Sequence, residues 1–281
     1  MKKIRYLFEA ALVRTLIALF GRLPPLTASN LGGMIGRTIG PLLSSNRKAT
    51  RHIQDSLHTD AQTTRKIIKD MWENIGRVFA EYPHLEHIGA HHVELVNAER
   101  LHTLSADPEL PAIFASAHLA NWEVAGPTVH KMNIDVDVIY RAPNNPYVAG
   151  ILQKCRSLDG TLQTYPKSSA GMRQVLGALK RGRKIGILID QKYNEGMEVE
   201  FFGRPAMTST SFIQMARKFD CPLFPVRVER IKGIDFRVTI FPPLDTQKDE
   251  ILLIREMHDY LEQWIAEHPG QWLWLHKRWK V

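Results

Sequence analysis

The sequence predicts an α/β fold: a sandwich with a central, largely parallel sheet and an N-terminal helical segment that associates with a membrane. Two observations predict this fold. From about residue 110 onward, short apolar runs alternate with longer amphipathic segments, a pattern typical of βα units that build a parallel sheet. Before residue 45, two apolar segments follow each other, which favours attachment to a membrane.

The expected strands are short apolar runs at residues 112–115, 136–140, 185–189, 223–228 and 236–241. The expected helices occupy residues 121–131, 146–156, 170–180, 209–219 and 250–267. Upstream, residues 60–82 carry an apolar stripe at helical spacing, which indicates a packed helix. No linker or repeat interrupts residues 46–281, so we expect one domain over that range.

Residues 1–45 are expected to form membrane-associating helices. The first apolar stretch, up to Phe20, contains Glu9 and Arg14. Since a charge near the centre of a spanning helix costs about 3 kcal/mol, we favour a helix lying on the membrane, with a short or tilted span as the alternative. Pro24-Pro25 ends this helix, and glycines then recur at four-residue spacing: Gly32, Gly36 and Gly40. Such spacing permits close backbone approach, either within a membrane or beside another helix.

The formal net charge of +8 indicates an acidic partner, such as an anionic membrane, a phosphorylated substrate or an acidic protein. No helix-turn-helix, zinc-finger or RNA-binding signature is present, so we expect no nucleic-acid partner. Cys155 and Cys221 have no metal or redox spacing and are expected to be packed thiols. Four clustered histidines lack the Cys or carboxylate of a usual zinc site: His84, His87, His91 and His92. We expect no metal and no cofactor.

His118 and Glu123 follow the first expected strand of the sheet. In a continuous helix, a five-residue offset would separate their side chains by about 140°, so they meet only if the chain turns between them. If they meet, Glu123 accepts the Nδ1 proton of His118 and leaves Nε2 free to take a proton from a hydroxyl. This pair suits transfer of an activated group to an alcohol. The alternative is a structural core histidine with a glutamate favoured by a helix dipole.

Arg141 and Asp190 also follow expected strands directly. Ligand sites in such sheets gather beyond the carboxyl ends of the strands, so one site can receive both of these side chains and His118. Arg141 is the candidate anion binder, since a guanidinium pairs well with a phosphate or a developing oxyanion. A structural ion pair is the alternative.

Four ordered blocks resemble those of the bacterial lipid A late acyltransferases of the lauroyl/myristoyl type, within the lysophospholipid acyltransferase superfamily. The blocks are His118–Glu123, Tyr140–Pro146, Asp190-Gln191 with Phe201–Ala206, and Cys221–Val226. A closing Trp-Leu-His-Lys-Arg-Trp, residues 274–279, matches as well. The resemblance covers residues 1–281 and implies a glycerol-3-phosphate-acyltransferase-like sandwich with an acyltransferase domain over residues 46–281.

The resemblance implies transfer of a fatty acyl chain from acyl carrier protein to a hydroxyl of a Kdo-bearing lipid A precursor. The reaction belongs to lipopolysaccharide biosynthesis at the cytoplasmic face of the bacterial inner membrane, so the implied partners are the carrier protein, the precursor and the anionic membrane. His118 would be the general base and Glu123 its orienting carboxylate. We expect direct transfer without an acyl-enzyme, because no G-x-S-x-G motif is present and neither cysteine has a partner base.

Three further residues carry expected roles at the substrate. Asn121, within the first block, is expected to bind substrate. Asp190 is expected to hydrogen-bond backbone or to orient the site. Arg204 is expected to meet a phosphate of the acceptor, at a place where many glycerolipid relatives carry Pro-Glu-Gly-Thr; this departure favours the lipid A branch.

Two other groups of residues have open interpretations. A basic run is either a solvated face or a docking patch for an acidic carrier protein: Lys180, Arg181, Arg183 and Lys184. Tryptophans crowd the C-terminus and suit either a membrane interface or a core: Trp264, Trp272, Trp274 and Trp279. The rival functions are the same chemistry on another glycolipid, an ornithine lipid or a lysophospholipid, and a non-catalytic membrane adaptor. A basic RNA-binding module ranks last.

Overall fold

A seven-stranded, mostly parallel sheet forms the centre of the computed structural model, which describes residues 2–141 and 143–279. The strand order is β1-β9-β8-β2-β5-β3-β4, and only the β8–β9 pair is antiparallel. The strands are β1 Val93–Val96, β2 Ala112–Ser116, β3 Val136–Tyr140, β4 Thr164–Pro166, β5 Lys184–Leu188, β8 Leu223–Lys232 and β9 Asp235–Ile240. A separate hairpin consists of β6 Met197–Phe201 and β7 Arg204–Thr208. The α/β prediction is confirmed. Residues 1, 142, 280 and 281 lie outside the described residues. All four belong to the expected domains, and Ala142 is also part of the second sequence block.

The α-helices are α1 Lys2–Gly21, α2 Pro25–Ile39, α3 Asn46–Leu57, α4 Ala61–Glu81, α5 Leu85–His91, α6 His102–Ala106, α7 Ala125–His130, α8 Pro146–Arg156, α9 Ser169–Lys180, α10 Ser211–Lys218 and α11 Glu250–Glu267. Short 3₁₀ helices are η1 Gly40–Leu42, η2 Tyr82–His84, η3 Ala98–Leu101, η4 Trp122–Val124, η5 Leu158–Gly160 and η6 Pro269–Gln271. Helix starts follow local chemistry. The side chain of Asn145 accepts hydrogen bonds from the first backbone N–H groups of α8, and a proline follows it at the first helical position.

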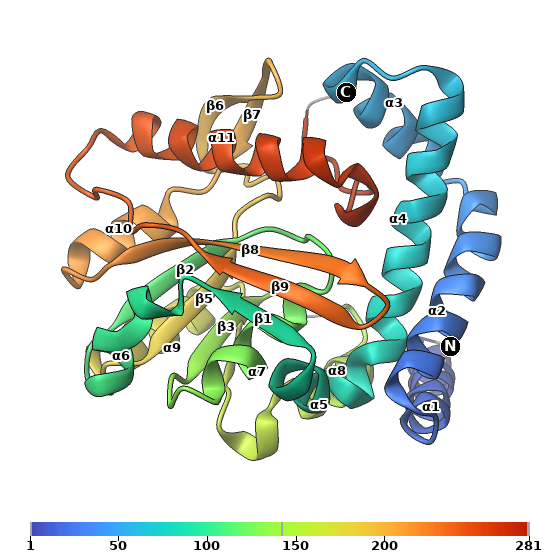
Figure 1. Cartoon of the computed structure of the whole chain (residues 1–281), viewed down its shortest axis with the longest axis horizontal. Helices are drawn as coiled ribbons and strands as arrows, with labels where there is room; N and C mark the ends of the chain where they lie inside the picture. The colour runs from blue at the N-terminus through green and yellow to red at the C-terminus, as the bar shows by residue number, and fades with distance from the viewer. Residues whose placement is uncertain (1, 142, 280–281) are drawn as a thin grey trace.

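Both faces of the sheet are buried, because successive side chains of a strand point to opposite sides. In β2, Ile113 and Ala115 join a core formed with α9, α10 and α11. The alternate residues, Ala112 and Phe114, join a second core with α5 and α7. Figure 1 shows α11 on one side of the sheet and α5, α7 and α8 on the other.

The C-terminal segment that follows α11 returns into the first core. All four clustered tryptophans are at least 96% buried, which identifies them as core residues and not as a membrane belt: Trp264, Trp272, Trp274 and Trp279. A buried tryptophan usually needs an acceptor for its ring N–H group: Trp274 donates to the carbonyl of Pro269 and Trp279 to that of Phe201. The segment is therefore fixed by packing.

The two N-terminal helices, α1 and α2, lie at one edge of the molecule, next to α4 (Figure 1). A Cβ atom at Gly32 of α2 would lie 2.4 Å from the carbonyl oxygen of Gly76 in α4. The regular glycines of α2 therefore permit close packing against α4 within this chain. Within residues 2–141 and 143–279, no helix combines the length and the apolar character needed to cross a membrane.

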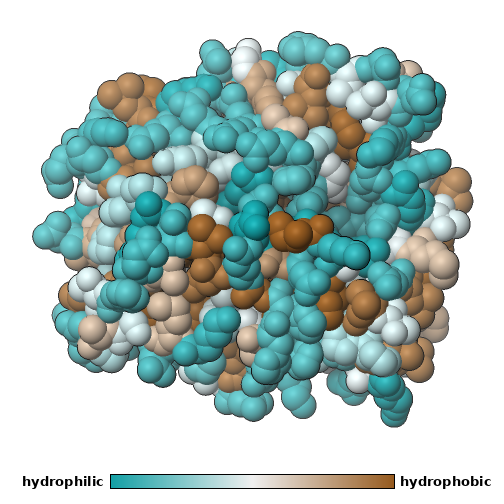
Figure 2. Space-filling view, in the orientation of Figure 1, coloured by the Kyte–Doolittle hydropathy of each residue, from teal (hydrophilic) through white to brown (hydrophobic). Residues whose placement is uncertain are grey.

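Apolar side chains remain exposed on the N-terminal helices. Ile4 and Phe8 of α1 are 74% and 73% exposed, and Met34 of α2 is 60% exposed. Figure 2 shows apolar surface along the edge of the molecule where Figure 1 places these helices. Association of residues 1–45 with a membrane stays a prediction.

Candidate active site

A cavity of about 390 Å³ lies between the sheet and helices α5, α7 and α8. Its walls are mainly apolar and include Leu85, Phe114, Val129, Val136, Val138, Leu162, Val226 and Ile240. Polar side chains line it as well: His118, Glu123, Arg141, Arg156, Lys167, Gln191 and His276. An apolar cavity with a few convergent polar groups is typical of a ligand site.

His118 lies just beyond β2, and the buried carboxylate of Asp190 lies just beyond the neighbouring strand β5. Asp190 Oδ1 is 2.8 Å from His118 Nδ1, and Oδ2 accepts hydrogen bonds from the backbone N–H of His118 (3.1 Å) and from Trp272 Nε1 (2.7 Å). Burial by itself raises the pKa of Asp190, but the histidine and these donors hold it well below the ordinary value. The ionised carboxylate thus keeps the Nδ1 proton in place and leaves Nε2 as the acceptor. The two roles expected for Asp190, backbone hydrogen bonding and orientation, are both present in this geometry.

The prediction that Glu123 accepts the Nδ1 proton of His118 is wrong, because Asp190 fills that position. The chain does turn between the two residues, at Ala120, which adopts a left-handed conformation with φ 49°. This turn is held by a hydrogen bond from the Ala120 N–H to the carbonyl of Gln271 (2.9 Å) and by Asn74, which donates to the Ala120 carbonyl (2.8 Å). The turn directs Glu123 away from Nδ1 of His118, although both residues line the cavity.

Glu123 instead forms a buried ion pair with Arg156 at the end of α8. Arg156 donates from Nε (2.8 Å) and Nη2 (2.5 Å), and the Tyr82 hydroxyl donates at 2.8 Å. Burial raises the pKa of Glu123, but Arg156 and these hydrogen bonds bring it below the ordinary value. Trp122 Nε1 also donates to this carboxylate (3.1 Å), and the Trp122 ring packs edge-on against His118 at 4.9 Å. Glu123 therefore contacts the histidine indirectly, through Trp122.

The sequence did not predict roles for Gln191 and His276, although both lie in blocks that carry the resemblance. Gln191 Nε2 is 3.1 Å from His118 Nε2 and 2.8 Å from His276 Nε2. Burial lowers the pKa of His276 to about 4, so its imidazole is neutral at pH 7. The available signal was position: Gln191 follows Asp190 directly, and His276 occupies the closing tryptophan-rich segment.

Arg141 lies in the cavity lining, as expected from its position after β3. The side chain is exposed, so it can reach a ligand that enters from outside. Lys167 lines the same cavity, and its pKa is lowered by burial and by the positive charge of Arg141. The two cations give this part of the site a positive potential that suits an anion.

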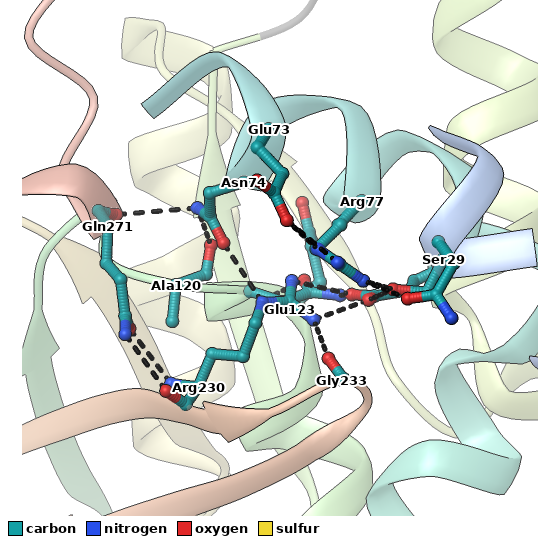
Figure 3. Close-up of polar contacts among 12 residues, drawn as sticks. Ser29, Glu73, Asn74, Arg77, Ala120, Glu123, Arg230, Gly233 and Gln271 are labelled. Carbon is teal, nitrogen blue, oxygen red and sulfur yellow. Dashed lines mark hydrogen bonds and ion pairs between the residues drawn. The ribbon is translucent and has the colours of Figure 1, made fainter. Parts of the chain in front are cut away.

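Asn121 and Arg204 are absent from the cavity lining that the described residues form. Asn121 is fully buried and donates to Glu81 (2.8 Å), part of a polar network that connects Ser29, Asn74 and Arg230 (Figure 3). Its other atom, Oδ1, accepts from the Glu123 N–H. The structure thus places Asn121 in the support of the first block and does not place it against a substrate.

Arg204 of the β6–β7 hairpin contacts α3. It forms an ion pair with Asp55 (3.0 Å), donates to Ser56 (2.6 Å) and lies 3.8 Å from the ring of Trp279. The expected contact with an acceptor phosphate has no place in this cavity, because the guanidinium already joins the hairpin to the helix.

The four-residue basic run does not form one exposed patch. Arg183 pairs with Asp135 and Asp137. Lys184 is 97% buried and donates to the carbonyl of Pro108 at 2.6 Å. Lys180 and Arg181 are exposed, so a docking patch of all four side chains is ruled out.

Comparisons with known proteins identify the family of this chain. The family model of the bacterial lipid A biosynthesis acyltransferases matches residues 1–281. A phosphatidylinositol mannoside acyltransferase from Mycobacterium tuberculosis strain H37Rv is 24% identical over 174 residues, which are 60% of this chain and 55% of that relative. The protein of the same description from strain CDC 1551 matches equally. The chain thus spans about half the length of these curated relatives. It belongs to the bacterial lipid A biosynthesis acyltransferase family, whose members transfer acyl groups.

Proposed function

We propose that this protein transfers a fatty acyl chain from an acyl carrier protein thioester to a hydroxyl of a Kdo-bearing lipid A precursor. The observation that carries the proposal is the oriented base: His118 Nδ1 is held by buried Asp190, while Nε2 faces a largely apolar cavity. Family membership supports the acyl transfer. The reaction takes place at the cytoplasmic face of the bacterial inner membrane, where the exposed apolar side chains of α1 and α2 contact lipid.

The chemistry requires one base and no protein nucleophile. His118 Nε2 removes the proton of the acceptor hydroxyl as its oxygen attacks the thioester carbonyl carbon. The new C–O bond forms, and the carbonyl electrons move to oxygen. When the oxyanion collapses, the C–S bond breaks, and the imidazolium returns its proton to the leaving sulfur. Asp190 stabilises the imidazolium during these steps, as the aspartate of a catalytic triad does.

The cavity walls provide the site for the acyl chain. Each buried methylene contributes about 0.8 kcal/mol, so an apolar slot holds a long chain firmly while the polar end of the cavity holds the reacting groups. In this proposal Arg141 and Lys167, the two cations that line the cavity together, bind a phosphate of the acceptor. Glu123 supports the site by holding Trp122 and Arg156 in the wall beside the base.

Another glycolipid is the second candidate acceptor. The mycobacterial relatives are named for acyl transfer to phosphatidylinositol mannoside. That acceptor also combines a phosphate with sugar hydroxyls, so the same base and the same cations would serve it. The chemistry is unchanged in this alternative, and only the acceptor differs.

The test is acyl transfer by the detergent-purified protein from acyl carrier protein thioesters of several chain lengths. The acceptors are a Kdo-lipid A precursor and, in parallel, a phosphatidylinositol mannoside. A mass gain of one acyl chain on the first acceptor, lost in His118→Ala and kept in the exposed-histidine control His91→Ala, is the expected result. A gain on the second acceptor alone selects the alternative. No gain with either acceptor, from protein that is folded, refutes the proposed function.

A further inference from the structure

The side chain of Gln191 connects the proposed base to a second histidine. Its Nε2 lies 3.1 Å from His118 Nε2 and 2.8 Å from His276 Nε2, and the two imidazole rings are 5.2 Å apart. A primary amide nitrogen has two N–H groups. One nitrogen atom can therefore donate to both rings at once.

The protons of this network have one consistent arrangement. His118 donates its Nδ1–H to the carboxylate of Asp190, so the neutral ring has no proton on Nε2, and Nε2 is an acceptor. His276 is neutral at pH 7 because burial lowers its pKa to about 4, so its Nε2 is available as an acceptor too. If the amide oxygen occupied this position instead, both Nε2 atoms would need protons, and His118 would be a doubly protonated cation. The amide N–H groups therefore point at the two histidines.

The position of the first N–H group is chemically significant. A hydroxyl that loses its proton to His118 must lie about 2.6–3.2 Å from Nε2, the same shell that the amide nitrogen of Gln191 occupies. When the hydroxyl takes that place, the displaced N–H lies beside the carbon under attack. An oxyanion donor acts at about 2.7–3.1 Å from the oxygen where negative charge develops.

We propose that Gln191 is an oxyanion donor of the acyl transfer and that His276 is the positioning residue that holds its amide. The inference rests on the proposed function and adds a residue to it. In the free enzyme, an N–H of Gln191 donates to the Nε2 lone pair of His118. The reacting hydroxyl then replaces this N–H as the donor to Nε2. The carbonyl oxygen of the thioester, as it becomes an oxyanion, then accepts the freed N–H. The second N–H stays hydrogen-bonded to His276 Nε2, so the amide keeps its orientation when the hydroxyl displaces the first N–H.

The C-terminal segment gives His276 a fixed position. Trp272 is tied to Asp190, and Trp274 and Trp279 are buried in the first core. His276 projects from this segment into the cavity lining. A fixed acceptor at 2.8 Å restricts the rotation of the Gln191 amide, and preorganised donors need no reorganisation when charge develops.

The test replaces each half of the pair. Gln191→Met keeps the side-chain length and removes both N–H groups, so we expect kcat to fall about 100- to 1,000-fold with little change in KM. His276→Ala frees the amide without removing it, so a loss of about tenfold is expected, which His276→Gln restores in part by offering an oxygen acceptor. In the double variant, the loss should equal that of Gln191→Met alone, because a positioning residue has no effect once its target is gone. The matched control is Gln62→Ala, an exposed position near the start of α4.

A second readout does not depend on turnover. The ¹⁵N resonance of His118 Nε2 should move in Gln191→Met, because the lone pair loses its donor, and it should stay unchanged in Gln62→Ala. Unchanged kcat together with an unchanged resonance in Gln191→Met overturns the inference. Strictly additive losses in the double variant overturn the role of His276. A wild-type protein that transfers no acyl chain refutes the proposed function separately, and the resonance still decides whether Gln191 caps His118.

Discussion

Replacing Asp190 with asparagine should change the proton position on His118 while keeping the shape of the site. Two N–H groups point at Oδ2 of Asp190, from the His118 backbone (3.1 Å) and from Trp272 Nε1 (2.7 Å). Neither donor can become an acceptor. The introduced amide must therefore turn its oxygen to these two groups and its NH₂ to His118 Nδ1.

The consequence is the wrong tautomer for catalysis. With an NH₂ group facing it, Nδ1 must accept a hydrogen bond, so the imidazole proton moves to Nε2. His118 then has no lone pair directed at the substrate hydroxyl. The corresponding change in a serine-protease triad lowers kcat about 10⁴-fold through the same tautomer effect. We expect Asp190→Asn to lower kcat by about 10³- to 10⁴-fold, or about 4–5.5 kcal/mol of transition-state stabilisation.

The assay compares kcat for acyl transfer with the ¹⁵N spectrum of His118 and the thermal unfolding curve. The chain offers a matched control, since Asp235 also contacts a histidine Nδ1, that of His92 at 2.8 Å, on an exposed surface. Asp235→Asn should leave kcat unchanged. A folded Asp190→Asn protein that keeps more than a tenth of wild-type kcat would refute the assignment of Asp190 as the orienting carboxylate.

Three further predictions concern the apolar cavity, the buried Glu123–Arg156 ion pair and the stability of the protein in acid. Gly186 of β5 lines the cavity, and a Cβ there would lie 3.3–3.4 Å from two valine side chains; Gly186→Val should therefore shift the preferred donor to a chain shorter by about two methylenes, each worth about 0.8 kcal/mol, and an unchanged chain-length profile would place the acyl chain elsewhere. Glu123→Gln leaves buried Arg156 without its counter-charge, so the free energy of unfolding in urea should fall by about 3–5 kcal/mol; recovery in the double variant with Arg156→Met would confirm the cause, and an unaltered urea midpoint in the single variant would contradict it. Burial lowers the pKa of His258 to about 3. Below about pH 6.5 the imidazole of His258 is protonated in the unfolded chain but stays neutral in the folded protein, so the free energy of unfolding should decline from about pH 6.5 toward pH 3. The urea midpoint should depend less on pH in His258→Asn.

The regular elements of the sheet were largely predictable from sequence. The expected strand at residues 136–140 and the helices at residues 146–156 and 250–267 coincide with β3, α8 and α11. The strand is mainly apolar, and each of the two helices begins after a residue whose side chain caps it, Asn145 and Asp249. The strands β1 and β4 were missed because they contain only four and three residues, too few to show a period. Their places in the sheet depend on pairing with β9 and β3, which lie far away or across a helix in the chain.

The hairpin of β6 and β7 was also missed, although its signal was present. Residues 197–201 alternate apolar and charged side chains, and Gly203 supplies a positive φ of 67° at the turn. Arg204, which follows the turn, was expected to bind a phosphate. The structure gives that arginine an ion pair with Asp55 instead.

The location of the site was predictable from sequence, but the hydrogen-bond partners of its residues were not. His118, Arg141 and Asp190 each follow a parallel strand, so the carboxyl-end rule brings them together. The partner of the base depended on the backbone at Ala120, whose left-handed conformation sends Glu123 away from the histidine. No local pattern marks an alanine for that conformation. His276 arrives from the far end of the chain through the packing of tryptophans, which sequence spacing does not report.

The two buried carboxylates of the site have different functions because their partners differ. Glu123 faces the permanent cation Arg156, so its charge is already neutralised before any reaction begins. Asp190 faces N–H donors and the ring of His118, so its charge is available to the imidazolium that forms when the base takes a proton. Loss of the Glu123 charge should therefore be felt mainly in the free energy of unfolding, and loss of the Asp190 charge mainly in kcat. If the two variants showed the opposite pattern, with Glu123→Gln folded but inactive and Asp190→Asn active, the electrostatic support of the base would have to come through Trp122 and the Glu123 side of the cavity.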